Sequence, residues 1–463
     1  MEKAKRIILG KIYTSNIEQE WAEAIVIEDN RIIYVGNKKG AEKHLKTNEN
    51  ILELDEDKLV LPGFIDSHMH PIVSGLQYSA CRTDGCQSIE EISLTIKEYL
   101  SKKPDAPWVF CSGYYDCHFP DSKPHKKYLD ELCSDRPLCY MRFDGHCYLL
   151  NSVALKIAGI TKETPNPHGG KIVLDEDGEL TGALFEAAMN LIRPHFPPRT
   201  LETLLEGFSV AKEKIIQDGI TSFTDAAVKP YLLTAYKELY SNNTGDLPWA
   251  SLCLAWRDSI GDKVKDPSNK NKSLSEIFEL PKSEKLRVNT IKLFVDGVLE
   301  SHTAFLEEPY CEIQTEEHEC CGMQLYKEEE LNETVAYLHE RGIQVHLHTV
   351  GDKAVRIALN AIEYAQKKAG RKLDLRHIVA HNQLINPSDI ERFKELGVVA
   401  NFSPYWAYYD ESGPKAEQVL GPERSQRQYP IGDMLKGGAK ICFGSDWPIG
   451  SYRPLDGIEI AVT

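Results

Sequence analysis

Two histidines separated by one residue, His68 and His70, end an apolar run of the sequence. Residues i and i+2 of a β-strand point to the same side, so both imidazoles can reach a single ion. Zinc and similar divalent cations accept neutral imidazole nitrogen as a ligand. Alone, however, the pair is equally compatible with two polar loop histidines. The rest of the sequence must decide between these two interpretations.

Three further potential ligands, His348, His381 and Asp446, each end another apolar run. Taken singly, such residues are more often structural than metal-binding. Together, at the ends of separate strands, they favour a metal site shared with the two histidines above. His346 and His377 lie in the same runs, where they either support the ligands or belong to the core.

Lys292 lies within an apolar run at 290–296, where a lysine is expected to be buried. One interpretation is an ion pair with a nearby carboxylate such as Asp296. The other is that burial lowers the pKa of the amine. A neutral amine can take up carbon dioxide and become a carbamate, which is a carboxylate-like bridge between two metal ions.

These residues require elements that bring the ends of distant strands together. Apolar runs alternate with helical periodicity along most of the chain, which is typical of parallel strands covered by helices. Eight such units predict an α/β protein with a (β/α)8 TIM-type barrel, in which reactive residues lie at the C-terminal strand ends. The predicted strands are 59–66, 108–113, 220–225, 290–296, 343–348, 377–381, 398–403 and 440–446.

The domain organisation follows from the segments around these strands. Residues 1–56 contain short strands and turns, which predict part of a small β-sandwich. Residues 57–463 predict the barrel, and the long stretch at about 72–200 predicts an insertion over the barrel mouth. Few residues follow Asp446, so we expect the C-terminal end of the barrel and of the sandwich to be missing from this chain, which leaves exposed strand edges.

Composition narrows the class of protein. The net charge of −16 and the absence of a basic stripe argue against a nucleic-acid or anionic-membrane partner. No apolar run reaches membrane-spanning length, and the run near the N-terminus is too short for a signal sequence. The 12 cysteines include no C-x-x-C pair. These features predict a cytoplasmic protein with reduced thiols.

The order of H-x-H, strand lysine, histidine, histidine and aspartate resembles the amidohydrolase superfamily. Within it, the sequence is similar to the amidohydrolase family three branch, which includes N-substituted formamide deformylases. The resemblance implies a (β/α)8 barrel, a small β-sandwich and one or two divalent metal ions, with zinc expected. The segments that carry it are spread over most of the chain, at 61–71, 292–310, 348–352, 376–383 and 444–448.

The resemblance also implies a mechanism. Metal-activated hydroxide attacks an amide, N-formyl or imide carbonyl and breaks its C–N bond, with an aspartate as proton shuttle. By position, the first ion would be held by His68 and His70, the bridge would be a carboxylated Lys292, the second ion would be held by His348 and His381, and the proton shuttle, also a ligand of the first ion, would be Asp446.

Four other positions are expected at the substrate pocket. His146 resembles a family histidine that faces substrate, which implies an oxyanion or orienting role; the alternative is a hydrogen-bonded loop histidine. Glu186 and Trp447 lie in further segments similar to the family. His302 stands where relatives commonly carry arginine, so a titratable group replaces a fixed charge and the substrate preference stays open.

The expected partner is a small amide-type substrate, and the resemblance is compatible with a homodimer. Two alternatives remain open. On the same barrel, metal hydroxide could cleave an ester, a lactone or a phosphoester. Alternatively, the chain could be a catalytically silent binding protein that a metal ion stabilises, since a fold does not by itself determine an activity.

Overall fold

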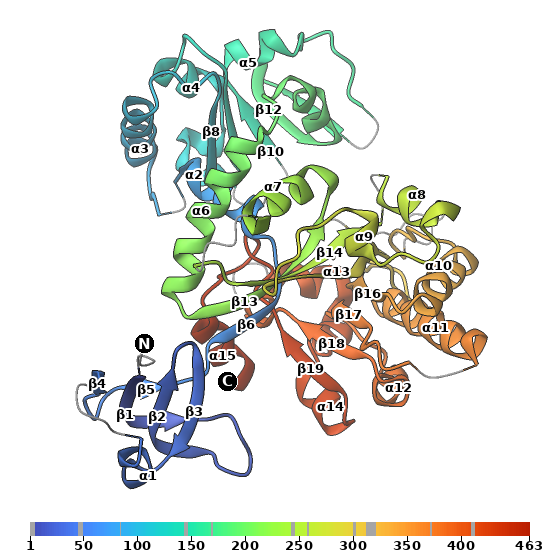
Figure 1. The fold of residues 1–463 in the computed structure, drawn as a ribbon. Coiled ribbons are helices and arrows are strands. Elements are labelled where there is room, and N and C mark those ends of the chain that lie inside the picture. The colour runs from blue at the N-terminus through green and yellow to red at the C-terminus, as the bar shows by residue number, and fades with distance from the viewer. Residues whose placement is uncertain are drawn as a thin grey trace. The chain divides into compact units, whose positions relative to one another are not determined.

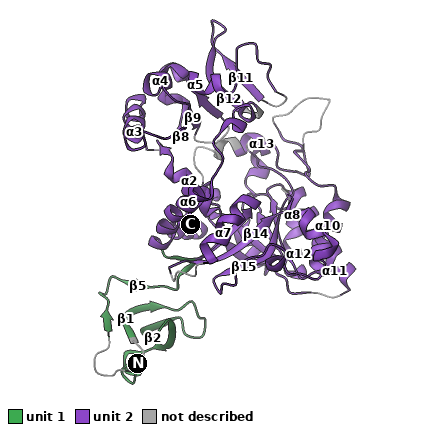
Figure 2. Cartoon of the chain, turned by 45° about the horizontal axis from the view of Figure 1, so that its top comes forward, with its two compact units in different colours: residues 1–65, 219–221 green, residues 66–218, 222–463 purple. Residues whose placement is uncertain are grey.

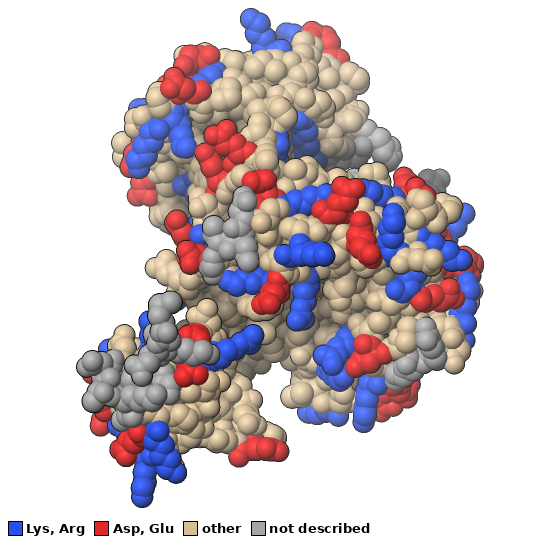
Figure 3. Space-filling model, viewed as in Figure 1, with Lys and Arg blue, Asp and Glu red and all other residues tan. Residues whose placement is uncertain are grey.

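The computed structural model forms two compact units, residues 1–65 with 219–221 and residues 66–218 with 222–463 (Figure 2). Among the described residues, no helix combines the length and the apolar character needed to cross a bilayer. On the face in Figure 3, basic and acidic side chains are interspersed. The described residues are 5–44, 50–83, 85–142, 147–167, 170–241, 246–256, 259–299, 302–311, 321–370, 373–408 and 413–463.

Eight strands form one sheet, in the order β6-β13-β14-β15-β16-β17-β18-β19 (Figure 1). The pairs from β13 to β19 are parallel, so the C-terminal ends of these strands lie at one edge of the sheet. The strands are β6 (Phe64–Met69), β13 (Ile220–Val228), β14 (Trp249–Ala255), β15 (Leu286–Phe294), β16 (Gln344–Thr349), β17 (Ile378–His381), β18 (Val399–Phe402) and β19 (Lys440–Phe443).

The first and last strands of this sheet, β6 and β19, approach each other and nearly close a barrel. The backbone N–H of Asp446 donates to the carbonyl of His68 at 2.7 Å. The N–H of His70 donates to the carbonyl of Trp447 at 2.9 Å. The predicted (β/α)8 architecture is therefore confirmed, and the chain segments around the two predicted metal-binding motifs are joined directly.

The helix α11 (Asp352–Ala369) shows how the sequence forms the helical layer. Val355, Leu359 and Ile362 are spaced by four and three residues, so they lie on one face, and all three are buried. Burial of each such side chain contributes about 1.5–3 kcal/mol. The helix ends at Ala369, and the next residue, Gly370, has a φ of 62°, a left-handed conformation that glycine adopts readily.

The other helices of the larger unit lie around the barrel sheet or in the inserted segment (Figure 1). Those outside the inserted segment are α2 (Pro71–Ser79), α6 (Leu201–Gln217), α7 (Pro230–Ser241), α8 (Ile260–Lys265), α9 (Leu274–Ile277), α10 (Glu328–Glu340), α12 (Ile390–Leu396), α13 (Gly413–Ser425), α14 (Ile431–Lys436) and α15 (Pro454–Val462). Those of the inserted segment are α3 (Ile89–Lys102), α4 (Lys126–Leu132) and α5 (Ser152–Ile157).

The inserted segment forms a second sheet of its own, in the order β11-β12-β10-β9-β8-β7. Its placement over the barrel mouth stays a prediction. The strands are β7 (Cys81–Arg82), β8 (Val109–Tyr114), β9 (Leu138–Arg142), β10 (Cys147–Leu150), β11 (Gly170–Leu174) and β12 (Leu180–Glu186).

One predicted barrel strand is wrong. The run 108–113 corresponds to β8 of the inserted sheet, and the missing barrel strand is β14. The strand β8 has parallel neighbours on both sides, so it is as apolar as a barrel strand. The end of β14 carries none of the candidate ligands, so no potential ligand at a strand end indicated this strand in the sequence.

The smaller unit contains a sheet in the order β3-β2-β1-β4, with β5 paired to β1. It buries apolar side chains in two clusters, around Val26 and around Ile25. Its completion as a sandwich stays a prediction. The elements are β1 (Lys5–Tyr13), β2 (Trp21–Glu28), β3 (Arg31–Gly36), α1 (Lys38–Glu42), β4 (Asn50–Glu53) and β5 (Leu59–Val60).

Gly444 is needed where β19 meets β6, because a side chain there would strike backbone. A Cβ on Gly444 would lie 2.4 Å from the backbone N of His68. We expect Gly444→Ala to lower the free energy of unfolding by about 1–3 kcal/mol, as overpacking does. Urea denaturation measures this. Gly432→Ala in α14 is the control, since an added Cβ meets no atom within 4 Å and alanine favours a helix. Equal losses in both variants would contradict the steric argument.

Candidate metal centre

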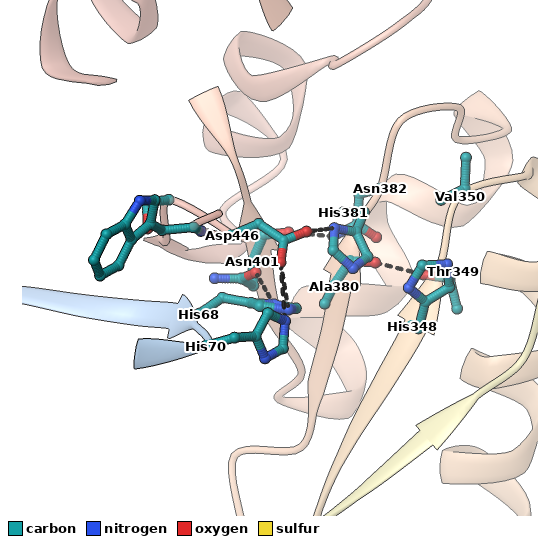
Figure 4. A network of polar contacts seen from close by, with 12 residues as sticks. His68, His70, His348, Thr349, Val350, Ala380, His381, Asn382, Asn401 and Asp446 are labelled. Atoms are coloured by element: carbon teal, nitrogen blue, oxygen red, sulfur yellow. Dashed lines mark hydrogen bonds and ion pairs between the residues drawn. The ribbon is translucent and has the colours of Figure 1, made fainter. Parts of the chain in front are cut away.

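His68, His70 and Asp446 meet where β6 and β19 approach each other (Figure 4). One ligand atom from each residue lies within 4.8 Å of the other two. Nε2 of His70 is 3.1 Å and Nε2 of His68 is 3.6 Å from Oδ1 of Asp446. Two imidazole nitrogens and a carboxylate oxygen form a donor set that suits a divalent cation.

His381 faces the same carboxylate from the end of β17. Its Nδ1 is 3.8 Å from Oδ2 of Asp446, and within the described part of the chain this buried nitrogen has no hydrogen-bond partner. Its ring stacks on Trp406 of the short helix η7 (Pro404–Ala407), with the centroids 4.8 Å apart. An unpartnered buried nitrogen is unfavourable, and a bound cation would give it a partner. The residues present therefore fit a metal ion.

His348 continues the row of imidazoles on β16, with its ring centroid 4.5 Å from that of His381. Its Nε2 donates to the carbonyl of Gly297 at 3.1 Å, because a carbonyl can only accept. The proton of this imidazole is thus on Nε2, and Nδ1 keeps its lone pair. Nδ1 is the atom through which His348 could bind a metal ion.

Lys292 on β15 is 1% exposed, as expected. Burial lowers the pKa of its amine to about 8, although the carboxylate of Asp446 acts in the opposite direction. Among the described contacts, Lys292 forms no ion pair with Asp296. Instead, Asp296 accepts hydrogen bonds from the backbone N–H groups of Phe305 and Gly351 at 2.9 and 2.8 Å. The interpretation of Lys292 as a partner of Asp296 is therefore wrong.

Asn401 on β18 sets the orientation of His68. The hydroxyl of Ser67 donates to the carbonyl of Phe443, so it must accept from the Asn401 amide nitrogen, 2.7 Å away. The amide oxygen of Asn401 then accepts from Nδ1–H of His68 at 3.2 Å. Nε2 of His346 lies 3.1 Å from the same Nδ1. His346 thus supports a candidate ligand, and the lone pair of Nε2 of His68 faces Asp446.

Burial decides the charge of three of the imidazoles. It lowers the pKa of His68 and of His381 well below 6.5 and that of His348 to about 3. The positive charge of Lys292 acts in the same direction. These side chains are therefore neutral at pH 7, the form in which histidine binds a metal ion.

His70 differs because carboxylates lie on both sides of its ring. Burial lowers its pKa, but contacts with Asp225 and Asp446 outweigh burial and raise the pKa to about 9. Nδ1 is 3.5 Å from Oδ1 of Asp225, opposite the Nε2 contact with Asp446. Two carboxylates around one imidazole favour a positive charge between them. Either a second proton on the ring or a bound metal ion can supply this charge.

The positions of the other predicted pocket residues say less about their roles. The ring of Trp447 is buried and packs against those of Tyr78 and Tyr452, with centroids 5.2 and 4.7 Å away. His302 is partly buried, and its ring lies 4.9 Å from that of Tyr310. His146 and the side chain of Glu186 lie outside the described residues. The roles of all four in binding substrate stay predictions.

Three buried residues at the site were not singled out from the sequence: Asp66, Asp225 and Asn401. Asp66 accepts from the backbone N–H of His68 at 3.0 Å and of Ser445 at 3.2 Å, which ties β6 to the segment after β19. Each of the three is a polar residue within or at the end of a predicted strand. That position was the only signal available in the sequence, and it does not reveal which side chain each residue contacts.

Comparisons with known proteins agree with this geometry, which defines a metal-dependent hydrolase. Residues 56–463 match the amidohydrolase family. The protein YtcJ of Bacillus subtilis is 29% identical over 98% of this chain and 82% of its own length. An N-substituted formamide deformylase of Arthrobacter pascens is 25% identical, over 98% and 83%. The chain therefore belongs to the amidohydrolase family, and the resemblance to its family three branch is confirmed.

A solved structure extends the comparison to the fold. The crystal structure of an uncharacterized metal-dependent hydrolase from Pyrococcus furiosus superposes with a TM-score of 0.77 and 25% sequence identity. The match covers 99% of this chain and 88% of that structure. The similarity therefore includes both the barrel and the inserted sheet.

His377 belongs to the core rather than to the row of candidate ligands. Its Nδ1 accepts from the backbone N–H of Val345 at 3.0 Å, so its proton is on Nε2 and is donated to Nδ1 of His339 at 2.9 Å. Both imidazoles are buried. Burial lowers the pKa of His377 to about 3.

This low pKa makes stability depend on pH. Between pH 6.5, where the unfolded imidazole gains a proton, and about 3, where the folded one does, only the unfolded chain is protonated at this position. Stability is therefore lost as the pH falls through that window. The wild type should have a higher free energy of unfolding than His377→Gln. We expect this difference to be about 2 kcal/mol smaller at pH 5 than at pH 7. Urea denaturation at both pH values measures the difference, and a difference that does not change with pH would refute the assignment.

Proposed function

We propose that this protein hydrolyses a carbon–nitrogen bond in a small amide-type substrate, with amide, N-formyl and imide carbonyls as the expected groups. The observation that carries the proposal is the meeting of His68, His70 and Asp446 at the C-terminal ends of parallel barrel strands. Reactive residues of such barrels lie at those ends. The similarity to an N-substituted formamide deformylase supports the choice of bond.

The candidate ligands fall into two groups on either side of Asp446. A divalent ion held there acts as a Lewis acid and lowers the pKa of water toward neutrality. Imidazole and carboxylate donors favour zinc, and a second ion would need a bridge that a carboxylated Lys292 can provide. The first group is His68, His70 and Asp446, and the second is His348 and His381.

Asp446 is suited to move the proton during hydrolysis. Its backbone is fixed by the hydrogen bond to the carbonyl of His68, and its side chain is 7% exposed. Oδ1 faces the histidines of β6, and Oδ2 faces His381. From this position the carboxylate accepts the proton of the attacking water and passes it to the leaving nitrogen. General acid–base catalysis of this kind contributes roughly 10²–10⁴-fold in rate.

The first test uses zinc- or manganese-loaded protein and a panel of small N-formyl and N-acyl amides. We expect the wild type to turn over at least one amide, and Asp446→Asn to lose at least about 100-fold in kcat while elemental analysis still finds metal. Asp433→Asn, at an exposed side chain of α14 paired with Lys436, is the control and should keep full activity.

Other outcomes of this test separate the alternatives. Turnover of esters, lactones or phosphoesters with no amide turnover would replace the proposed bond. Metal-loaded wild type that turns over no substrate of either panel would favour a silent binding protein. Equal kcat values for the wild type and Asp446→Asn would rule out the proton shuttle.

The second test addresses Lys292 as a bridge. With its pKa lowered to about 8, a substantial fraction of the amine is neutral at mildly alkaline pH and can react with carbon dioxide. We expect wild type loaded with zinc and bicarbonate to hold two ions per chain, and Lys292→Ala to hold one or none. Elemental analysis counts the ions, and ¹³C-labelled bicarbonate should give a carbamate signal in NMR only with the wild type. Two ions per chain in Lys292→Ala would rule out Lys292 as the bridge.

A further inference from the structure

His70 is held from outside the candidate metal centre by a second carboxylate. Nε2 faces Asp446, whereas Nδ1, on the opposite side of the ring, is 3.5 Å from Oδ1 of Asp225. Asp225 lies on β13, the neighbour of β6 in the sheet, and is 1% exposed. A carboxylate buried so deeply needs compensating partners, because its removal from water is unfavourable.

The other main partner of Asp225 is the hydroxyl group of Tyr236, on α7. Its hydroxyl donates to Oδ2 at 2.7 Å, and the backbone N–H of Ala227 donates to Oδ1 at 3.3 Å. The phenol is fully buried, and burial together with the nearby carboxylate raises its pKa well above 10. The hydroxyl thus remains a donor, and Oδ1 of Asp225 is left directed at His70.

We propose that Tyr236 and Asp225 form a positioning arm that fixes the ring and the proton of His70 for metal binding. A carboxylate can only accept, so Asp225 retains the proton on Nδ1 of His70 when a cation takes the place of the proton on Nε2. Nε2, which faces Asp446, then gives its lone pair to a cation. An acidic partner on the outer nitrogen also makes the inner nitrogen a stronger ligand. The inference rests on the proposed metal centre and assigns a role to two residues outside it.

Tyr240, one turn further along α7, provides a matched control. It is also buried, and its hydroxyl donates to the carbonyl of Pro248 at 2.7 Å. Tyr236→Phe and Tyr240→Phe therefore each remove one buried hydroxyl and one hydrogen bond of the same length from the same helix. They differ in that only Tyr236 contacts the carboxylate behind His70.

The experiment measures zinc binding to the chelator-treated full chain by competition with a chromogenic chelator, and the thermal stability of the same samples. We expect Asp225→Asn to weaken zinc affinity by about 10–100-fold, as loss of a carboxylate behind a ligand histidine does. Tyr236→Phe should weaken it by about fivefold, the equivalent of one net hydrogen bond. Tyr240→Phe should keep wild-type affinity while losing a similar amount of thermal stability.

The outcomes distinguish the arm from the metal centre itself. If the wild type binds zinc and Tyr236→Phe binds it as tightly as Tyr240→Phe, the arm is overturned and the metal centre stands. If the wild type binds neither zinc nor manganese, the proposed function fails and the arm fails with it. Should Asp225→Asn not fold, the comparison of the two tyrosine variants still decides.

Discussion

The closure of the barrel between β6 and β19 is the interaction on which the site depends. His68 and Asp446 lie near opposite ends of the chain, and the hydrogen bond from the Asp446 N–H to the His68 carbonyl brings them together. The carboxylate of Asp66 reinforces this junction by accepting from the N–H groups of His68 and Ser445. Burial raises the pKa of Asp66 to about 6, and these hydrogen bonds oppose that rise. The carboxylate of Asp66 is thus used for structure, whereas that of Asp446 faces the histidines of β6.

A common pattern orients three of the candidate ligands. Each imidazole has an acceptor on the nitrogen that points away from the site: the Asn401 amide oxygen for His68, the Asp225 carboxylate for His70 and the Gly297 carbonyl for His348. An acceptor on one nitrogen retains a proton there, which leaves the other nitrogen available to a cation. His381 instead stacks on an indole ring, and its buried Nδ1 has no hydrogen-bond partner in the described part of the chain. These four surroundings favour a cation at the centre of the group.

The family and the fold define a metal-dependent hydrolase, and the site holds groups that suit such chemistry. Neutral imidazoles suit a metal ion, a buried amine with a lowered pKa suits carboxylation, and one carboxylate stands between the two groups of histidines. His302 stands where the resemblance leads one to expect an arginine, and its role in substrate choice stays a prediction. The candidate ligands, in contrast, lie on or shortly after strands of the barrel sheet.

The sequence by itself determined the barrel and the six candidate ligands, because both leave local signals: alternating apolar and helical periodicity, and polar residues at the ends of apolar runs. It misplaced one strand, 108–113, because a strand with parallel neighbours on both sides is apolar in either sheet, and it overlooked β14, whose end carries no candidate ligand. Only the tertiary structure showed that Asn401 and His346 contact His68 and that Asp225 contacts His70. It also showed that Asp296 accepts hydrogen bonds from backbone N–H groups instead of pairing with Lys292. These pairings join residues far apart in the chain, and no local pattern of residues specifies which distant side chain a buried polar group will meet.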